Sequence, residues 1–405
     1  MTLVPYRQVL ALPGVRSLLL VAMLARIPVA AASVTLTLHV LELGRGYGAA
    51  GLAGTALTVG AALGAPLMGR LVDRRGLRPM LALTTTAEAV FWVAAQALPY
   101  PGLLVASFFG GLLTLPVFSV VRQSIAALVP VSQRRPAYAL DSMSVDLSFM
   151  VGPALAVLIA TSVSPRAAML ALAGGLVLSG LALYVHNPPV RTDDEAVTQP
   201  PPRRQWLTLQ LVGVLVISAA STVVLSGTDV AVVAVLREAD QVAWTGVVLA
   251  AWSVYSMVGG FIYGLFARPL PPVAIVALLG VCTIPIGLGG DQWWLLALAL
   301  VPAGALCAPA LAATANAMSR LAPASVRGEA MGLHGSAITV GNALGAPLAG
   351  AAMDAFGPAW GFAASGLVGT LAALAVLPGE LRHRRQPPSK SAAAVSVMAE
   401  AGAES

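Results

Sequence analysis

Apolar residues run along the chain in stretches of about 20, and short polar breaks separate them. A helix needs about 20 residues to cross the hydrocarbon core of a bilayer, so each stretch is long enough for one membrane span. Gly, Pro and charged residues mark the breaks between the stretches. The pattern predicts twelve membrane helices, at residues 17–41, 48–69, 79–98, 101–129, 137–161, 165–186, 207–236, 243–267, 272–290, 293–320, 328–354 and 358–378.

The composition agrees with a membrane protein. Hydrophobic residues make up 58% of the chain and charged residues only 10%, whereas soluble domains carry about 25% charged residues. Such a chain cannot cover a water-facing surface. The net charge of +6 does not indicate a nucleic-acid partner, because the basic residues fall in loops between apolar stretches. The lipid bilayer, including its acidic head groups, is the expected neighbour.

The basic residues are distributed unevenly between the two sides of the predicted bundle. Most of the 23 Lys and Arg residues fall in the loops on the side of the N-terminus. Short loops rich in Lys and Arg stay in the cytoplasm. The bias predicts a multi-pass protein of a bacterial-type cytoplasmic (inner) membrane with both termini in the cytoplasm.

A polar, proline-rich segment at 187–206 interrupts the apolar pattern near the middle of the chain. We interpret it as a cytoplasmic linker between two six-helix halves, at 1–186 and 207–378. The polar end of the chain, 379–405, is predicted to be a disordered cytoplasmic tail.

The two halves share a residue pattern. One constant shift of the numbering aligns four pairs of residues, Pro116 with Pro309, Pro130 with Pro323, Arg134 with Arg327 and Gly152 with Gly345. These pairs place the fourth and fifth spans on the tenth and eleventh. The pattern predicts a parallel internal repeat about an axis along the membrane normal.

The loop between the second and third spans, 69–80, reads GRLVDRRGLRPM. It resembles the loop signature of the major facilitator superfamily: a glycine, an aspartate four residues later, and basic residues around a second glycine. The residues that match this signature are Gly69, Asp73, Arg74, Gly76 and Arg78. Leu77 departs from it, because the family usually has a basic residue there.

The resemblance implies an all-α membrane protein with twelve transmembrane helices in two pseudo-symmetric six-helix halves. It also implies a role for the loop, which latches a conformational cycle on the cytoplasmic side. In the family the loop aspartate faces the start of the eleventh helix, which corresponds here to a contact between Asp73 and the region of Gly328. A negative charge at that position is favourable because the N-terminus of a helix carries about half a positive charge.

A second motif lies in the fifth span, where residues 148–157 read SFMVGPALAV. The stretch resembles the antiporter motif of exporting members of the same superfamily. Gly152 and Pro153 match that motif, and Ser148 replaces its first glycine. The resemblance implies export. Ordinary close packing and bending of helices explains the same small residues and the proline.

Four ionisable residues lie inside predicted spans of the first half: Arg26, Glu88, Arg122 and Asp146. A charge at membrane depth is costly unless it is paired or hydrated, so each is a candidate for function. Their similar depths allow two ion pairs, Asp146 with Arg122 and Glu88 with Arg26. Either these pairs are static, or the group binds substrate and protons in a central cavity. We expect Asp146 to be the proton site, with Glu88 as the alternative.

Two further polar residues lie near the outer ends of symmetry-related spans, His39 in the first and Asp229 in the seventh. We predict that they meet across the outer mouth when the cavity faces inward. The alternative is that each side chain reaches interfacial water.

The sequence has no glycine-rich phosphate loop with Lys and Ser or Thr, and its His and Cys residues do not have metal-ligand spacing. We therefore expect no enzyme activity, no metal and no cofactor. The function that fits best is a monomeric secondary transporter that exports a small amphipathic organic compound in exchange for protons. One alternative is a proton-linked importer or uniporter of a sugar-like or other polar nutrient. Another is a non-transporting receptor or scaffold.

Overall fold

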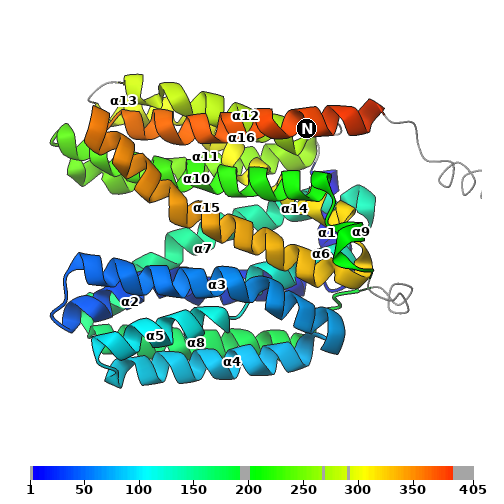
Figure 1. Cartoon of the computed structure of the whole chain (residues 1–405), viewed down its shortest axis with the longest axis horizontal. Coiled ribbons are helices and arrows are strands. Elements are labelled where there is room, and N and C mark those ends of the chain that lie inside the picture. The colour runs from blue at the N-terminus through cyan, green and yellow to red at the C-terminus, as the bar shows by residue number, and fades with distance from the viewer. Residues whose placement is uncertain (1–2, 192–200, 267–269, 290–291, 386–405) are drawn as a thin grey trace, which may run out of the picture.

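The computed structural model describes residues 3–191, 201–266, 270–289 and 292–385, and these residues form helices and connecting turns without a β-strand. Figure 1 shows the helices side by side in two stacked groups. The α-helices are α1 (Val4–Ala11), α2 (Val15–Glu42), α3 (Tyr47–Arg75), α4 (Leu77–Ala94), α5 (Tyr100–Leu112), α6 (Val117–Leu128), α7 (Arg134–Ser162), α8 (Pro165–His186), α9 (Arg203–Trp206), α10 (Leu209–Glu238), α11 (Thr245–Leu265), α12 (Pro272–Thr283), α13 (Trp293–Ala299), α14 (Val301–Leu321), α15 (Arg327–Phe356) and α16 (Trp360–Arg385). Short 3-10 helices are η1 (Ala95–Ala97), η2 (Val131–Gln133), η4 (Val242–Trp244), η5 (Ile284–Gly289) and η6 (Ala324–Val326).

The predicted all-α membrane fold is confirmed. Within the described residues, nine helical segments are long and apolar enough to cross a membrane. The third, ninth and eleventh predicted spans are also helical. They correspond to α4, to α12 with η5, and to α15. We call α2 to α8 the first half and α10 to α16 the second half.

The fourth span is broken, although the sequence predicted one continuous helix. The chain leaves the helix after Leu112 and re-enters it at Val117. Pro116 has no N–H group to donate and restricts the residue before it, so it favours a break. Its counterpart in the second half, Pro309, lies inside α14 without interrupting that helix. The sequence repeat therefore does not extend to the local shape of this span.

The repeat does extend to the following turn. After Pro130 and after Pro323 the chain forms a single 3-10 turn, η2 in the first half and η6 in the second. Each turn leads directly into a long helix, α7 at Arg134 and α15 at Arg327. The aligned Pro and Arg pairs in the sequence thus mark equivalent structural positions.

Two elements at the ends of the chain differ from the prediction. The short helix α1 precedes the first span and was not predicted. The last helix, α16, continues to Arg385 instead of ending at 378, since its last residues include the helix formers Glu, Leu and Arg. The rest of the predicted tail, 386–405, and the middle of the predicted linker, 192–200, lie outside the described residues.

The helix α1 connects the two halves. The hydroxyl of Tyr6 donates a hydrogen bond of 2.6 Å to the carbonyl of Phe261 on α11. The two rings are stacked, with their centroids 5.0 Å apart. Burial raises the pKa of Tyr6 to about 12, so the hydroxyl keeps its proton and remains a donor at neutral pH. The short helix α1, which precedes the first half, is therefore anchored on the second half.

The halves meet mainly through α3 against α15 and α7 against α11. We define the motif end of the bundle as the end that carries the turn between α3 and α4, at Gly76. Figure 1 shows α3 and α15 approaching each other at this end, on the right of the view, and diverging toward the opposite end. The close contacts agree, because Gly332 of α15 lies against the backbone at Ala65 of α3. The helices α1 and α9 also lie at the motif end.

Candidate functional site

The two glycines of the loop motif have separate structural roles. Gly76 has a φ of +83°, in the left-handed region that favours glycine, and it forms the turn between α3 and α4. Gly69 faces Gly328 of α15, where an added Cβ would overlap the Gly328 carbonyl. A Cβ on Gly328 would in turn lie 2.6 Å from an oxygen of Asp73. The close approach of α3 to α15 therefore depends on both Gly69 and Gly328.

Asp73 caps the N-terminus of α15 from another helix. The residue before α15 is Val326, whose side chain cannot accept a hydrogen bond. Asp73 Oδ1 accepts the N–H of Gly328 at 3.0 Å, and Oδ2 accepts the N–H of Glu329 at 2.8 Å. The first N–H groups of a helix have no partner within it, and the helix dipole favours a negative charge there. The contact expected from the family resemblance is therefore present.

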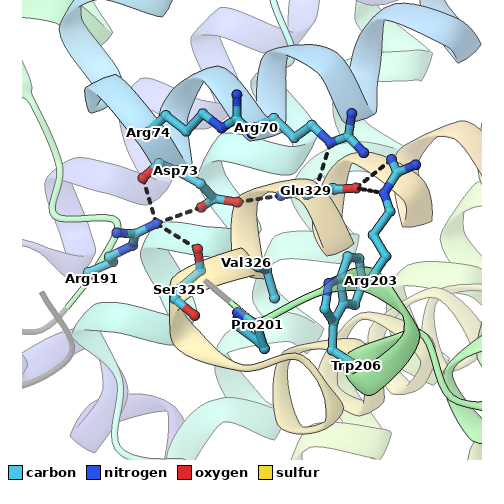
Figure 2. A pocket seen from close by; sticks show the side chains of 10 residues that line it. All are labelled: Arg70, Asp73, Arg74, Arg191, Pro201, Arg203, Trp206, Ser325, Val326 and Glu329. Atoms are coloured by element: carbon cyan, nitrogen blue, oxygen red, sulfur yellow. Dashed lines mark hydrogen bonds and ion pairs between the residues drawn. The ribbon is translucent and has the colours of Figure 1, made fainter. Parts of the chain in front are cut away.

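Three arginines from separate segments reinforce this contact, as Figure 2 shows. Arg191 donates to Asp73 Oδ1 at 3.2 Å and to the carbonyl of Ser325 at 2.9 Å. Glu329 forms two ion pairs. Arg70 Nε lies 2.8 Å from Glu329 Oε2, and Arg203 Nη2 lies 2.6 Å from Glu329 Oε1. Arg191 and Arg203 lie in the predicted linker and were not among the predicted site residues. Arg70 joins α3 to α15, Arg191 joins α3 to the turn before α15, and Arg203 ties the linker to α15. We call these contacts, together with the capping of α15 by Asp73, the latch.

The remaining basic residues of the motif point in different directions. Arg74 lies on α3 beside the latch contacts and makes no ion pair with a described residue (Figure 2). Arg78 turns away from α15, and its guanidinium lies 5.5 Å from the centroid of the Tyr184 ring on α8. This is a cation–π distance. Arg78 therefore attaches α4 to α8 and does not contribute to the contact between the halves.

The buried charges of the first half are arranged around Asp141, which was not predicted as a site residue. Arg26 Nη2 lies 2.6 Å from Asp141 Oδ1, and Arg122 Nε lies 3.3 Å from Asp141 Oδ2. All three side chains are buried. The predicted pairs, Arg122 with Asp146 and Arg26 with Glu88, are therefore wrong.

The rotation of α7 explains the correction. Asp146 is five residues after Asp141, and at 100° per residue the two side chains point about 140° apart. Asp141 faces the interior of the first half, whereas Asp146 faces the second half. Asp141 lies close to the predicted start of the fifth span, so its sequence position gave little sign that it is buried.

Arg122 also reaches the second half. Its Nη1 lies 3.3 Å from Nδ1 of His334 on α15, and His334 Nε2 lies 3.2 Å from the hydroxyl of Thr314 on α14. A guanidinium only donates, so Nδ1 must accept and His334 must be neutral with its proton on Nε2. His334 was not predicted, because an isolated histidine in an apolar span has no recognisable spacing. The buried network thus crosses between the halves.

Glu88 has neutral partners. Its carboxylate accepts the Trp92 Nε1–H at 2.8 Å and the N–H of Leu115 at 3.2 Å, and it is hydrogen-bonded to the Thr114 hydroxyl. Thr114 and Leu115 lie in the break of the fourth span. Glu88 therefore satisfies backbone and side-chain donors that the break leaves without helical partners.

Asp146 contacts the second half. Its Oδ2 accepts a hydrogen bond of 2.7 Å from the hydroxyl of Ser256 on α11, and that hydroxyl accepts the N–H of Ala308 on α14 at 3.1 Å. Asp229 on α10 is exposed and close enough to Asp146 for their charges to interact. Neither carboxylate has an ion pair with a described residue. Two acidic side chains, one from each half, thus lie near each other.

The predicted bend motif lies where α7 packs on α2. A Cβ on Gly152 would be 2.5 Å from the carbonyl of Ile27, and Pro153 continues inside α7. The equivalent glycine, Gly345 of α15, has the same relation to α10, at 2.6 Å from the carbonyl of Val223. Both glycines allow the backbones of paired helices to approach closely.

The predicted outer gate is not formed in this structure. His39 is buried, and its Nδ1 lies 3.5 Å from Glu42 one turn later on the same helix. No hydrogen bond or ion pair joins His39 to Asp229 among the described residues. The prediction concerns the state in which the motif end is open, and the motif end is closed here.

A cross-linking experiment tests the gate. We expect His39→Cys and Asp229→Cys to form a disulfide when Asp73→Asn opens the motif end, and to form little or none when the motif end is closed. The two native cysteines, Cys282 and Cys307, are first replaced by serine. The measurement is the oxidised fraction on a non-reducing gel. Absence of the bond in both states would contradict the gate.

Comparison with known proteins identifies the family. The sequence model of the Major Facilitator Superfamily matches residues 18–290 and 271–401. The chain therefore belongs to this superfamily, and it is a secondary transporter rather than an enzyme. No curated protein is similar enough in sequence to match the chain.

Solved structures of the superfamily have the same fold. A bacterial homologue of the iron transporter ferroportin, in an outward-facing state, aligns with a TM-score of 0.73 and 14% identity over 91% of this chain and 99% of that one. The human organic anion transporter MFSD10 aligns at 0.70 and 18% identity over 90% and 100%. The proton:xylose symporter XylE aligns at 0.66 and 14% identity over 89% and 94%. The TM-scores show that the fold is shared, and the low identities leave the substrate open.

Proposed function

We propose that the protein exports a small amphipathic organic compound in exchange for protons by alternating access. In this proposal it lies in a bacterial-type cytoplasmic membrane as a monomer, with the motif end and both termini in the cytoplasm. The two halves are those of the sequence analysis, 1–186 and 207–378, joined by the linker 187–206. The closed latch then corresponds to a state that is shut toward the cytoplasm.

The hydrogen bond between Asp146 and Ser256 is the observation that supports proton coupling. An ionised carboxylate only accepts hydrogen bonds, and such bonds are stronger than neutral ones. Protonation of Asp146 removes the charge and weakens the bond to Ser256. Because Ser256 belongs to the second half, binding of a proton changes the contact that the halves must break when they rock.

The other buried charges of the first half support the same assignment. Asp141 is already shared by Arg26 and Arg122, and Glu88 is hydrogen-bonded by three donors. Asp146 has one hydroxyl partner and a neighbouring acid, Asp229. Of these acids, Asp146 is the one for which protonation alters a contact between the halves. Glu88 is the structural acid in this proposal.

The direction of transport rests on the resemblance of the Gly152-Pro153 stretch to the motif of exporting members. The position of Gly152 between α7 and α2 is compatible with this role, since α7 also carries Asp146. A bend in α7 would move the proton site and the packing surface together. The test below also separates export from import.

We expect Asp146→Asn to reduce transport driven by a pH gradient at least tenfold, because asparagine cannot exchange a proton. Downhill flux or substrate exchange should persist. The measurement uses everted membrane vesicles with a preset pH gradient, and it records which candidate compounds dissipate that gradient and in which direction.

The matched control is Glu88→Gln, which removes the other unpaired buried acid of the first half and should lose less of the coupled transport. Ser256→Ala should retain a proton-dependent activity with an altered pH profile. Uphill export by Asp146→Asn with an unchanged pH dependence would show that Asp146 is structural. Gradient-driven uptake in right-side-out cells, without exchange, would favour the importer instead.

A further inference from the structure

A cavity of about 560 Å³ opens at the motif end, beside the latch and away from Asp146. Its volume lies in the range of small-molecule sites, about 300–1,000 Å³. Segments from both halves and from the linker form its walls. Its charged lining residues are Arg70, Asp73, Arg74, Arg191, Arg203 and Glu329. We call it the arginine cavity.

The arginine cavity carries an excess of positive charge. Four guanidinium groups face two carboxylates, and both carboxylates are already occupied by the latch contacts described above. Arg74 has no ion pair with a described residue, and Arg191 Nε is buried without a hydrogen-bond partner among them. Each guanidinium has five N–H donors, so several remain available to a ligand.

The geometry suits a phosphate group in particular. Guanidinium groups bind phosphate oxygens through paired N–H donors, and three or four arginines around one cavity can surround a tetrahedral anion. Trp206, buried on α9, adds an apolar wall that fits the organic part of a phosphate ester (Figure 2). We propose that the arginine cavity binds a phosphate-bearing anion, either free phosphate or the head group of an anionic phospholipid.

Binding at this site would be linked to the conformational cycle. Arg70 and Arg74 belong to α3 of the first half, whereas Glu329 belongs to α15 of the second. When α3 and α15 separate, the walls separate with them. A ligand that binds only one state stabilises that state in proportion to its concentration. The anion therefore holds the motif end closed and regulates transport without entering the substrate path.

The test uses the full-length protein with Arg74→Gln, because Arg74 takes no part in the latch contacts. The matched control is Arg75→Gln, which removes the same charge from the next, exposed residue outside the cavity. In detergent without lipid, the thermal unfolding midpoint is measured against inorganic phosphate, with choline chloride added to equal ionic strength. In nanodiscs, native mass spectrometry measures retention of phosphatidylglycerol against phosphatidylcholine.

We expect binding to weaken about tenfold in Arg74→Gln, since a charge-assisted hydrogen bond is lost, and to change little in Arg75→Gln. An Arg74-dependent effect of inorganic phosphate identifies free phosphate as a sufficient ligand. An effect only in the nanodisc arm identifies the lipid head group. Either result supports the proposal, and neither depends on the transport assay.

Three outcomes would overturn the proposal. The first is equal weakening in both variants, which would leave only general charge attraction. The second is no binding in either arm. The third concerns the acidic stretch of the linker, Asp193, Asp194 and Glu195. If phosphate or lipid binds only after these residues are changed to their amides, the acids of the chain itself are the occupant.

Discussion

Replacement of Asp141 by asparagine is expected to destabilise the folded protein by about 3–5 kcal/mol, because it leaves Arg26 and Arg122 buried without a counter-charge. Few single substitutions have so large an effect. The loss should appear as a lower yield of monodisperse protein and a lower unfolding midpoint in detergent.

The control removes the charges together. A variant with Arg26→Met, Arg122→Leu and Asp141→Leu should recover much of the lost stability, since apolar residues of similar volume often replace a buried ion network at little cost. It should nevertheless fail to transport, because the connection from Arg122 to His334 is gone. A stable Asp141→Asn single variant would show that the two arginines find other partners or water.

Asp73→Asn is expected to shift the protein toward the state in which the motif end is open. The amide keeps one acceptor but loses the charge that attracts Arg191 and the N-terminus of α15. Charge-assisted hydrogen bonds are stronger than neutral ones by about 1–2 kcal/mol, which corresponds to a change of about 5- to 30-fold in the ratio of closed to open states.

The shift is measured as the alkylation rate of a cysteine introduced at Ser119, which faces α15 next to the latch and is largely buried here. The rate should rise with Asp73→Asn. Asp354→Asn serves as the matched control, because Asp354 is an exposed acid near the other end of α15. Expression should be unchanged in both variants. Equal rates in all three proteins would contradict the latch.

The membrane spans were predictable because their signal is long and additive. About 20 consecutive apolar residues indicate a span whatever the details of packing. The ends and interruptions depend on single contacts. Pro116 breaks its helix and Pro309 does not. At the first break Glu88 of a neighbouring helix accepts the freed N–H of Leu115, and such a partner is invisible in the local sequence.

The contact of Asp73 with the start of α15 was expected from the resemblance to the family's loop signature, and spacing along the chain alone does not indicate it. Arg74 and Arg78 match the same signature, but neither contributes to the contact between the halves. The two linker arginines, Arg191 and Arg203, were not predictable from the sequence. They reach α3 and α15 from a segment without secondary-structure periodicity, and only the folded chain brings them there.

The partners of the buried arginines could be predicted only in part. Depth along a helix can be estimated from the sequence at about 1.5 Å per residue, and it predicted an acid of the fifth span as the partner of Arg122 but assigned Arg26 to Glu88 of the third span. The rotation of each helix about its axis decides which acid pairs with a buried arginine, and the packing of neighbouring helices sets that rotation. The sequence therefore indicated that ion pairs form but assigned them to Asp146 and Glu88 instead of Asp141.

The anchoring of α1 has a practical consequence for handling the protein. Tyr6 ties α1 to α11 of the second half. A bulky peptide placed immediately before α1 would be held at the junction of the halves and would act on the equilibrium between their arrangements. An affinity or fluorescent tag is better placed after α16, which extends beyond its membrane-length stretch.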